Sequence, residues 1–245
     1  MIMKAKRRRM ALIGAVLCLF YGAVAHAQER LVISQSGGVE LMGQTIAFRF
    51  LCAAYQEMGV AIEVQSYPAE RAVVVANSGA TAGVLTRMEG LEGIYPNLVR
   101  VPVPVSYLDT MAFTRDPDLK VSGWESLRPY RIVFMRGNKL AEQKTAGMNV
   151  VTVTSPEQGF QMLMADRADV VVESRDVWFE MRRMHVEGVQ MREPPLMTLP
   201  TYHYLNKRYD EDRVPRLAAI LKRLHDNGTF KRITAEAIRE KENAR

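Results

Sequence analysis

Residues 67–105 read YPAERAVVVANSGATAGVLTRMEGLEGIYPNLVRVPVPV, and they set the pattern of the whole chain. A helical segment over 69–77 ends at an Asn-Ser-Gly turn. A short apolar strand over 82–85 follows, and extended segments are predicted over 98–105 and 110–113. This alternation of helices and strands predicts an α/β fold with parallel sheets.

The same alternation continues on both sides of this stretch. Before it, the sequence predicts a strand over 31–34, a helix over 45–58 and a strand over 61–65. After it, strands are predicted over 131–135, 150–153 and 170–172, with helices over 139–146, 155–165 and 177–184. An extended segment over 202–205 and helices over 214–227 and 234–242 complete the chain. Two α/β units with a helical tail predict two lobes.

The N-terminus has the three parts of a secretory signal peptide. Lys4 to Arg9 is cationic, residues 11–24 are almost all apolar, and Ala25-His26-Ala27 offers small residues to a signal peptidase. We therefore expect a signal peptide over 1–27, cleavage after Ala27 and a periplasmic protein. The alternative, a membrane anchor, needs about 20 apolar residues, and this run is shorter.

Removal of the signal peptide leaves an almost neutral chain. All five charged residues of the segment are basic, so the remainder carries 28 Lys and Arg against 27 Asp and Glu, a net charge of +1. Without a basic block, binding to nucleic acid is excluded. Cys52 has apolar neighbours and is interpreted as a buried small residue. The histidines lack metal-binding spacing, so we expect no metal and no cofactor.

Two arginines are candidate ligand-binding residues. Arg71 and Arg87 stand at the ends of short apolar segments, where a planar guanidinium can grip both oxygens of a carboxylate. Other interpretations stay open at this point. Arg87 also fits a surface arginine before Glu89, and Arg71 also fits a structural brace on Glu70 or on the backbone.

Two more candidates have structural alternatives of their own. Ser155 opens the helix predicted over 155–165, so it is first of all an N-cap, although a cap that faces a cleft can leave N–H groups free for an anion. Tyr67 ends a predicted strand, where its ring can stack on a ligand or pack between lobes.

Five motifs follow one another along the chain: Pro68-x-x-Arg71, Asn77-Ser78-Gly79, Tyr95-Pro96-Asn97-Leu98, Trp124-Glu125-Ser126-Leu127 and Ala168-Asp169-Val170-Val171-Val172-Glu173. Their order resembles that of bacterial periplasmic solute-binding proteins, in the family that includes polar amino-acid receptors. The resemblance covers nearly all of the chain after the signal peptide. It implies two lobes, each a mostly parallel sheet flanked by helices, joined by two crossing strands, with lobe 1 over 28–113 and 203–245 and lobe 2 over 114–202.

The resemblance also implies roles for individual residues. It implies that Arg87 binds the carboxylate of an amino-acid-like ligand and that Glu173 receives the ligand ammonium. Thr86 stands beside Arg87, where it can add a hydroxyl donor. From the residues alone, Glu173 fits a partner for Arg175 equally well. Ala82 and Val84 stand where many relatives have acids, so the ligand class cannot be copied from them.

The predicted function is that of a non-catalytic, monomeric receptor. It would capture a small polar ligand by lobe closure and present it to a membrane permease. A sensory module for a membrane-bound receptor is the first alternative. An enzyme on the same fold, such as a dehydratase, is the second, and it would need a placed acid or base. The candidates for that role are Glu40, Glu173 and His203, which show no recognisable pairing in the sequence.

Overall fold

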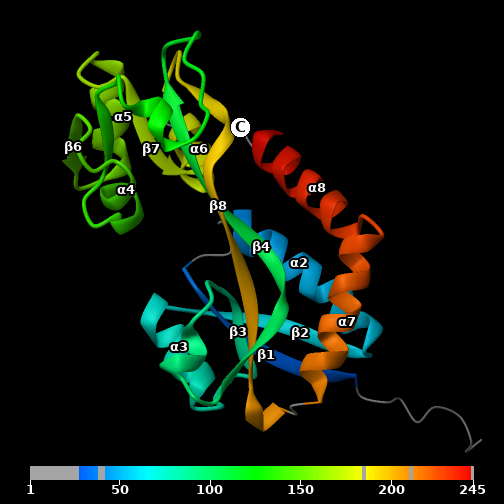
Figure 1. Cartoon of the computed structure of the whole chain (residues 1–245). Coiled ribbons are helices and arrows are strands. Elements are labelled where there is room, and N and C mark those ends of the chain that lie inside the picture. The colour runs from blue at the N-terminus through cyan, green and yellow to red at the C-terminus, as the bar shows by residue number, and fades with distance from the viewer. Residues whose placement is uncertain (1–27, 38–41, 184–185, 210–211, 244–245) are drawn as a thin grey trace, which may run out of the picture.

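Two long antiparallel strands, β4 (Leu98–Thr114) and β8 (Gln190–Asn206), run through the molecule (Figure 1). The computed structural model describes residues 28–37, 42–183, 186–209 and 212–243. The two strands pair from Leu98 opposite Asn206 to Thr114 opposite Gln190. Each has 17 residues, so each belongs to the sheet of both lobes.

The first lobe is built on three parallel strands that join β8 through β3. They are β1 (Glu29–Ser36), β2 (Val60–Tyr67) and β3 (Gly83–Arg87). Residues of β3 alternate between two layers of helices, because successive side chains of a strand point to opposite faces. Val84 packs with α3, and Leu85 packs in the core shared with α2 and α7. The helices of this lobe are α2 (Met42–Glu57), α3 (Ala69–Asn77), α7 (Arg213–Asp226) and α8 (Thr229–Asn243).

The second lobe repeats this plan on the other side of the crossing strands. Its parallel strands are β5 (Ile132–Met135), β6 (Val150–Val153) and β7 (Val170–Ser174), and β7 pairs antiparallel with β4. Its helices are α4 (Lys139–Lys144), α5 (Pro156–Met164) and α6 (Arg175–Arg183). The described strands form one sheet in the order β2-β1-β3-β8-β4-β7-β5-β6. The predicted α/β fold with two lobes and two crossing strands is confirmed.

The crossing strands are longer than the sequence indicates. The segments predicted over 98–105 and 110–113 are parts of β4, and the one over 202–205 is the end of β8. Prolines at 194, 195 and 200 hide the rest of β8, because proline weakens a strand prediction. The first two lie in a bulge, where Thr110 pairs with Met197 but Ala112 already pairs with Arg192. A bulge accommodates residues that cannot join the ladder.

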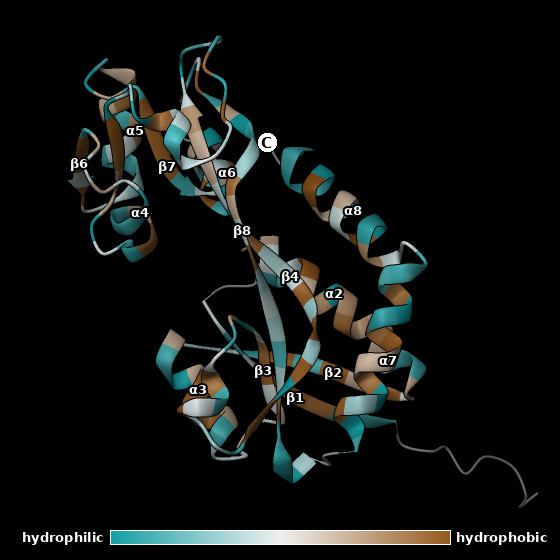
Figure 2. Ribbon diagram, in the orientation of Figure 1, coloured by the Kyte–Doolittle hydropathy of each residue, from teal (hydrophilic) through white to brown (hydrophobic). Residues whose placement is uncertain are grey.

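The crossing strands have two distinct faces. On the α3/α4 face, Leu98 packs with Val73 of α3, and Ala112 packs with Ala141 of α4. On the α2/α6 face, Val101 packs with α2 and α7, and Met111 packs with α5 and α6. Figure 1 shows α3 and α4 on one side of these strands and α7 and α8 on the other. In Figure 2 the strands β1, β3 and β7 are mostly brown, as expected for strands covered by helices on both faces.

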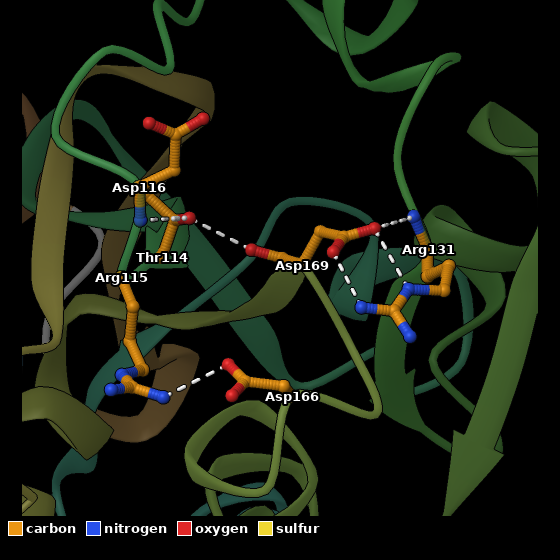
Figure 3. Close-up of polar contacts among 6 residues, drawn as sticks. All are labelled: Thr114, Arg115, Asp116, Arg131, Asp166 and Asp169. Carbon is orange, nitrogen blue, oxygen red and sulfur yellow. Dashed lines mark hydrogen bonds and ion pairs between the residues drawn. The ribbon is translucent and has the colours of Figure 1, made fainter.

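A polar network closes the outer end of the second lobe (Figure 3). Arg131 donates two hydrogen bonds from its guanidinium and one from its backbone N–H to Asp169. The Thr114 hydroxyl donates to the Asp169 carbonyl at 2.8 Å, and Arg115 pairs with Asp166 at 2.9 Å. These contacts join the end of β4 to the starts of β5 and β7, so we interpret the network as a structural brace.

Two expectations about chain segments stay predictions. The signal peptide over 1–27 lies outside the described residues. The lobe boundaries at 113/114 and 202/203 fall inside β4 and β8, which continue from one lobe into the other.

None of the described helices combines the length and apolar character needed to cross a membrane.

Candidate functional site

In both lobes the carboxyl ends of the parallel strands point toward the middle of the crossing strands. Arg87, the last residue of β3, pairs with Tyr202, which pairs in turn with Pro104 of β4. Ser174, the last residue of β7, pairs with Thr110 of β4. Thr110 lies six positions after Pro104 along β4, which corresponds to about 20 Å of strand. Ligands of open α/β sheets bind at such strand ends, so this region is the candidate site.

Arg87 is half-buried and held in place by neutral oxygens. Its Nη1 donates to the Ser36 hydroxyl at 2.8 Å and to the Thr86 carbonyl at 3.0 Å, and its Nη2 donates to the Ala69 carbonyl at 2.9 Å. Among the described residues, no carboxylate lies within ion-pair distance of this guanidinium. Burial lowers the pKa of Arg87, and the nearby charge of Glu70 partly offsets this effect.

The contacts of Arg87 leave part of its hydrogen-bonding capacity unused. A guanidinium has five N–H donors, and three of them are engaged here. The Nε donor and one Nη2 donor have no acceptor among the residues that the structure describes. The arrangement can therefore accept an anion without breaking the contacts that fix the side chain.

Arg71 lies close in sequence but has a different environment. Its side chain is exposed and makes no hydrogen bond or ion pair with any described residue. Glu70, one partner in the brace interpretation, accepts a hydrogen bond from the Tyr95 hydroxyl instead. Among the described residues, Arg71 therefore has neither the brace on Glu70 nor the one on the backbone, and its contact with a ligand stays a prediction.

Three other candidates occupy the ends of their elements. The Thr86 hydroxyl donates to that of Thr201 at 2.7 Å, which leaves the Thr201 hydrogen free for a further acceptor. Ser155 is the N-cap of α5, where its hydroxyl accepts from the Gln158 N–H, as expected. Tyr67 ends β2 half-buried, and its carbonyl accepts from the Gly37 N–H at 3.3 Å.

Glu173 is half-buried and lacks a cationic partner among the described residues. The alternative pairing with Arg175 is wrong, because Arg175 binds Asp109 and Glu193, each at 2.9 Å. Burial raises the pKa of Glu173, and the Ser174 N–H, which donates to its carboxylate at 2.8 Å, opposes that shift. Glu173 pairs with Met111 and so lies on the α2/α6 face of the sheet.

The structure adds residues that the sequence reasoning missed. Ser36 and the Ala69 carbonyl hold Arg87, and neither carries a sequence signal for that role. Ser174 follows Glu173 and pairs with Thr110, so strand alternation puts it on the α3/α4 face. Arg87 also contacts the start of α3, which lies on that face. Ser174 is therefore a second candidate on β7.

Packing explains why Ala82 and Val84 stand where many relatives have acidic residues. Ala82 is 1% exposed and lies in the core with α2, and Val84 is fully buried against α3. A carboxylate at either position would be buried among apolar groups, which is costly without a partner.

Of the remaining residues considered for catalysis, His203 and Cys52 are described, and each has a structural environment. His203 is fully buried, with Nδ1 2.7 Å from the Val84 carbonyl and Nε2 3.0 Å from the Tyr55 hydroxyl. Burial raises the pKa of the half-buried Cys52, which keeps the thiol protonated. Glu40 lies outside the described residues. Within the described part of the chain, no group of three or more His, Cys, Asp or Glu residues is arranged to hold a metal ion.

Comparison with known proteins supports the fold more strongly than it supports a role for any individual residue. No protein-family model matches the chain. An uncharacterised protein of Shewanella oneidensis is 28% identical over 193 residues, which cover 75% of this chain and 72% of that protein.

Solved structures resemble the chain along most of its length at low identity. The L-cystine solute receptor of Neisseria gonorrhoeae, in its unliganded open conformation, has a TM-score of 0.66 at 15% identity and covers 86% of this chain and 92% of its own. An ancestral cationic amino acid solute-binding protein has a TM-score of 0.61 at 15% identity, over 84% of this chain and 94% of its own. A histidine kinase sensor domain with similarity to periplasmic binding proteins has a TM-score of 0.58 at 15% identity, over 85% and 96%. The chain has the two-lobed fold of periplasmic binding proteins.

Proposed function

We propose that this protein is a solute-binding protein that captures a small, polar, amino-acid-like ligand between its lobes. The observation that carries the proposal is the environment of Arg87. Its guanidinium sits at a strand end beside the crossing strands, fixed by three neutral oxygens, with no carboxylate among the described residues to neutralise it. A ligand carboxylate supplies the missing negative charge.

The physical case rests on preorganisation. A free arginine side chain loses rotamer entropy when it binds an anion, but the Arg87 fork is already held by Ser36 and by two backbone carbonyls. Partial burial lowers the local dielectric constant, so a charge-assisted hydrogen bond there is stronger than one at the surface. These properties favour a bidentate carboxylate over a neutral ligand.

The remaining site residues have proposed roles around this clamp. Thr86 and Thr201 supply hydroxyl groups beside Arg87. Tyr67 and Arg71 are the other proposed ligand contacts from the first lobe. Ser155 belongs to the second lobe at the start of α5. For the ligand ammonium we propose Glu173, with Ser174 as the alternative on the opposite face of β7. Glu173→Gln and Ser174→Ala distinguish these two, because the residue that contacts the ammonium is the one whose change weakens binding.

The proposed setting follows from the predicted signal peptide. The mature protein would work in the periplasm as a monomer, bind its ligand without chemical change and hand it to a membrane permease. Lobe closure about β4 and β8 would bury the ligand, as in other hinged binding proteins.

A sensory module is the second candidate, because a histidine kinase sensor domain is among the similar structures. In that case the ligand-bound protein would bind a membrane receptor. Chemical cross-linking in membranes, with and without ligand, distinguishes the two roles. Capture of a permease supports transport, and capture of a kinase or cyclase supports sensing.

The test is a thermal-shift screen of the purified protein against L-amino acids, dicarboxylates and short peptides. We expect one chemical class to raise the melting temperature of the wild type, and Arg87→Ala to abolish that rise. Arg87→Lys keeps the charge but loses the planar fork, so it should bind at least tenfold more weakly.

The matched control is Arg216→Ala on α7, an exposed arginine without a described partner. It should bind as the wild type does. If Arg87→Ala binds as tightly as Arg216→Ala, Arg87 is not the carboxylate clamp. Conversion of a bound compound into a product would instead favour an enzyme.

A further inference from the structure

A cavity of about 430 Å³ lies beside the middle of the crossing strands, and we call it the hinge cavity. The first turns of α2 and α6, the middle of β4, part of β8 and one side of α8 enclose it. Neither Arg87 nor any of the other sequence-predicted ligand residues lines it. Its walls come from both lobes, and it is separate from the proposed carboxylate clamp.

The polar part of the hinge cavity has an excess of negative charge. Arg175 is shared by Asp109 and Glu193, each at 2.9 Å, so one guanidinium serves two carboxylates. Asp176 is a third carboxylate in the wall and pairs with none of the described arginines. The backbone N–H groups of Met42 and Gly43 bind it at the start of α2, and the Lys241 charge also acts on it.

The remaining wall is apolar and partly aromatic. Tyr107 and Phe230 meet edge to face, with ring centroids 5.9 Å apart, and both rings line the cavity. Met42, Ile46 and Ile238 complete this side. An aromatic wall attracts a cation through the ring electrons, and an aliphatic wall favours a hydrocarbon group.

We propose that the hinge cavity is a second ligand site, and that it binds a small organic ammonium carrying an apolar group. The charge excess selects a cation, and the apolar wall selects the hydrocarbon body. Burial raises the pKa of Asp176, so an ammonium beside it would stabilise the charged carboxylate. An anion would meet three carboxylates, against one arginine in the wall and the charge of Lys241, which is why the carboxylate ligand of the Arg87 site is not expected here.

Isothermal titration calorimetry of the purified protein with 2-phenylethylammonium tests this site. We expect saturable one-to-one binding, and at least tenfold weaker binding of the neutral 2-phenylethanol and the anionic 3-phenylpropanoate. Asp176→Asn keeps the shape and the acceptor oxygen but removes the charge, so it should weaken ammonium binding at least tenfold. Thr234→Phe fills the cavity from α8 and should abolish binding.

Two controls keep the result specific. Ala235→Phe adds the same ring to the exposed side of α8 and should bind the ammonium as the wild type does. Arg87→Ala should also bind it normally, so failure of the carboxylate clamp and failure of this site are distinguishable. Absence of saturable binding, equal binding of the anion, or undiminished binding by a folded Thr234→Phe protein would overturn the proposal.

Discussion

At the scale of single residues, His203 shows how the core of the first lobe is tied together. A carbonyl can only accept a hydrogen bond, so Nδ1 of His203 carries the proton that meets the Val84 carbonyl at 2.7 Å. Nε2 is then the acceptor for the Tyr55 hydroxyl at 3.0 Å. The Tyr55 contact requires the neutral ring, because a protonated Nε2 cannot accept a hydrogen bond. Burial lowers the pKa of His203 from 6.5 to about 4.

This assignment predicts a pH dependence of stability. Because the folded pKa lies below the unfolded one, the contribution of neutral His203 is complete above about pH 6.5 and is lost as the pH falls toward 4. The shift corresponds to about 3 kcal/mol of unfolding free energy at pH 4. Urea denaturation between pH 7 and pH 4 should show this loss in the wild type. His203→Gln should be less stable at pH 7 but lose less on acidification, and equal losses in both proteins would contradict the assignment.

The sequence could predict Arg87 as a site residue but not its surroundings. An arginine at the end of an apolar strand is a local feature, visible in residues 82–87. Its partners Ser36 and Ala69 are distant in the chain and meet it only after β1, β3 and α3 are assembled. Alternation in β7 is local too, but which of Glu173 and Ser174 faces α3 and α4 depends on pairing with β4.

At the scale of elements, β3 pairs with β8 so closely that one position must be glycine. A Cβ atom on Gly83 would lie 2.0 Å from the Tyr204 carbonyl oxygen, which is backbone and cannot move aside cheaply. Gly83→Ala should therefore lower the unfolding free energy by about 3 kcal/mol, as expected for an overpacked site. Urea denaturation with circular dichroism measures this change.

Gly93→Ala is the matched control, because a Cβ atom there meets nothing within 4 Å. Its effect should stay within about 0.5 kcal/mol of the wild type. Equal stability of the two alanine variants would show that β8 lies farther from β3 than the contact implies.

Element boundaries were predictable where the pattern is local and failed where distant pairing decides. The alternating strands and helices around 131–172 follow from apolar runs and turn residues. The length of β8 does not, because its prolines read as breaks, whereas pairing with β4 extends it across a bulge. The bulge is a property of the strand pair, so one strand's sequence cannot reveal it.

At the scale of the whole molecule, the two lobes touch through more than the crossing strands. Met42 and Ile46 of α2, Phe179 of α6 and Ala237 of α8 form one buried apolar cluster. Phe179 belongs to the second lobe and the other three to the first, so this inter-lobe cluster holds one lobe against the other. The fold was predictable from the order of the elements, but this contact was not, because α6 and α8 are far apart in sequence.

The inter-lobe cluster predicts how the resting position of the lobes is set. Phe179→Ala removes the ring that the second lobe contributes, at a cost of about 3 kcal/mol if the site cannot collapse. Two exposed residues, Val74 of α3 and Val151 of β6, are replaced by cysteines for spin labelling, and Cys52→Ser removes the native thiol. Pulsed electron paramagnetic resonance then measures the distance between the labels, and so the separation of the lobes. We expect Phe179→Ala to broaden this distance distribution, because the inter-lobe cluster is then weakened and the relative position of the lobes depends more on β4 and β8. Glu180→Ala, an exposed change on the same helix, should leave it unchanged. An unchanged distribution in a folded Phe179→Ala protein would mean that the crossing strands alone fix the lobes.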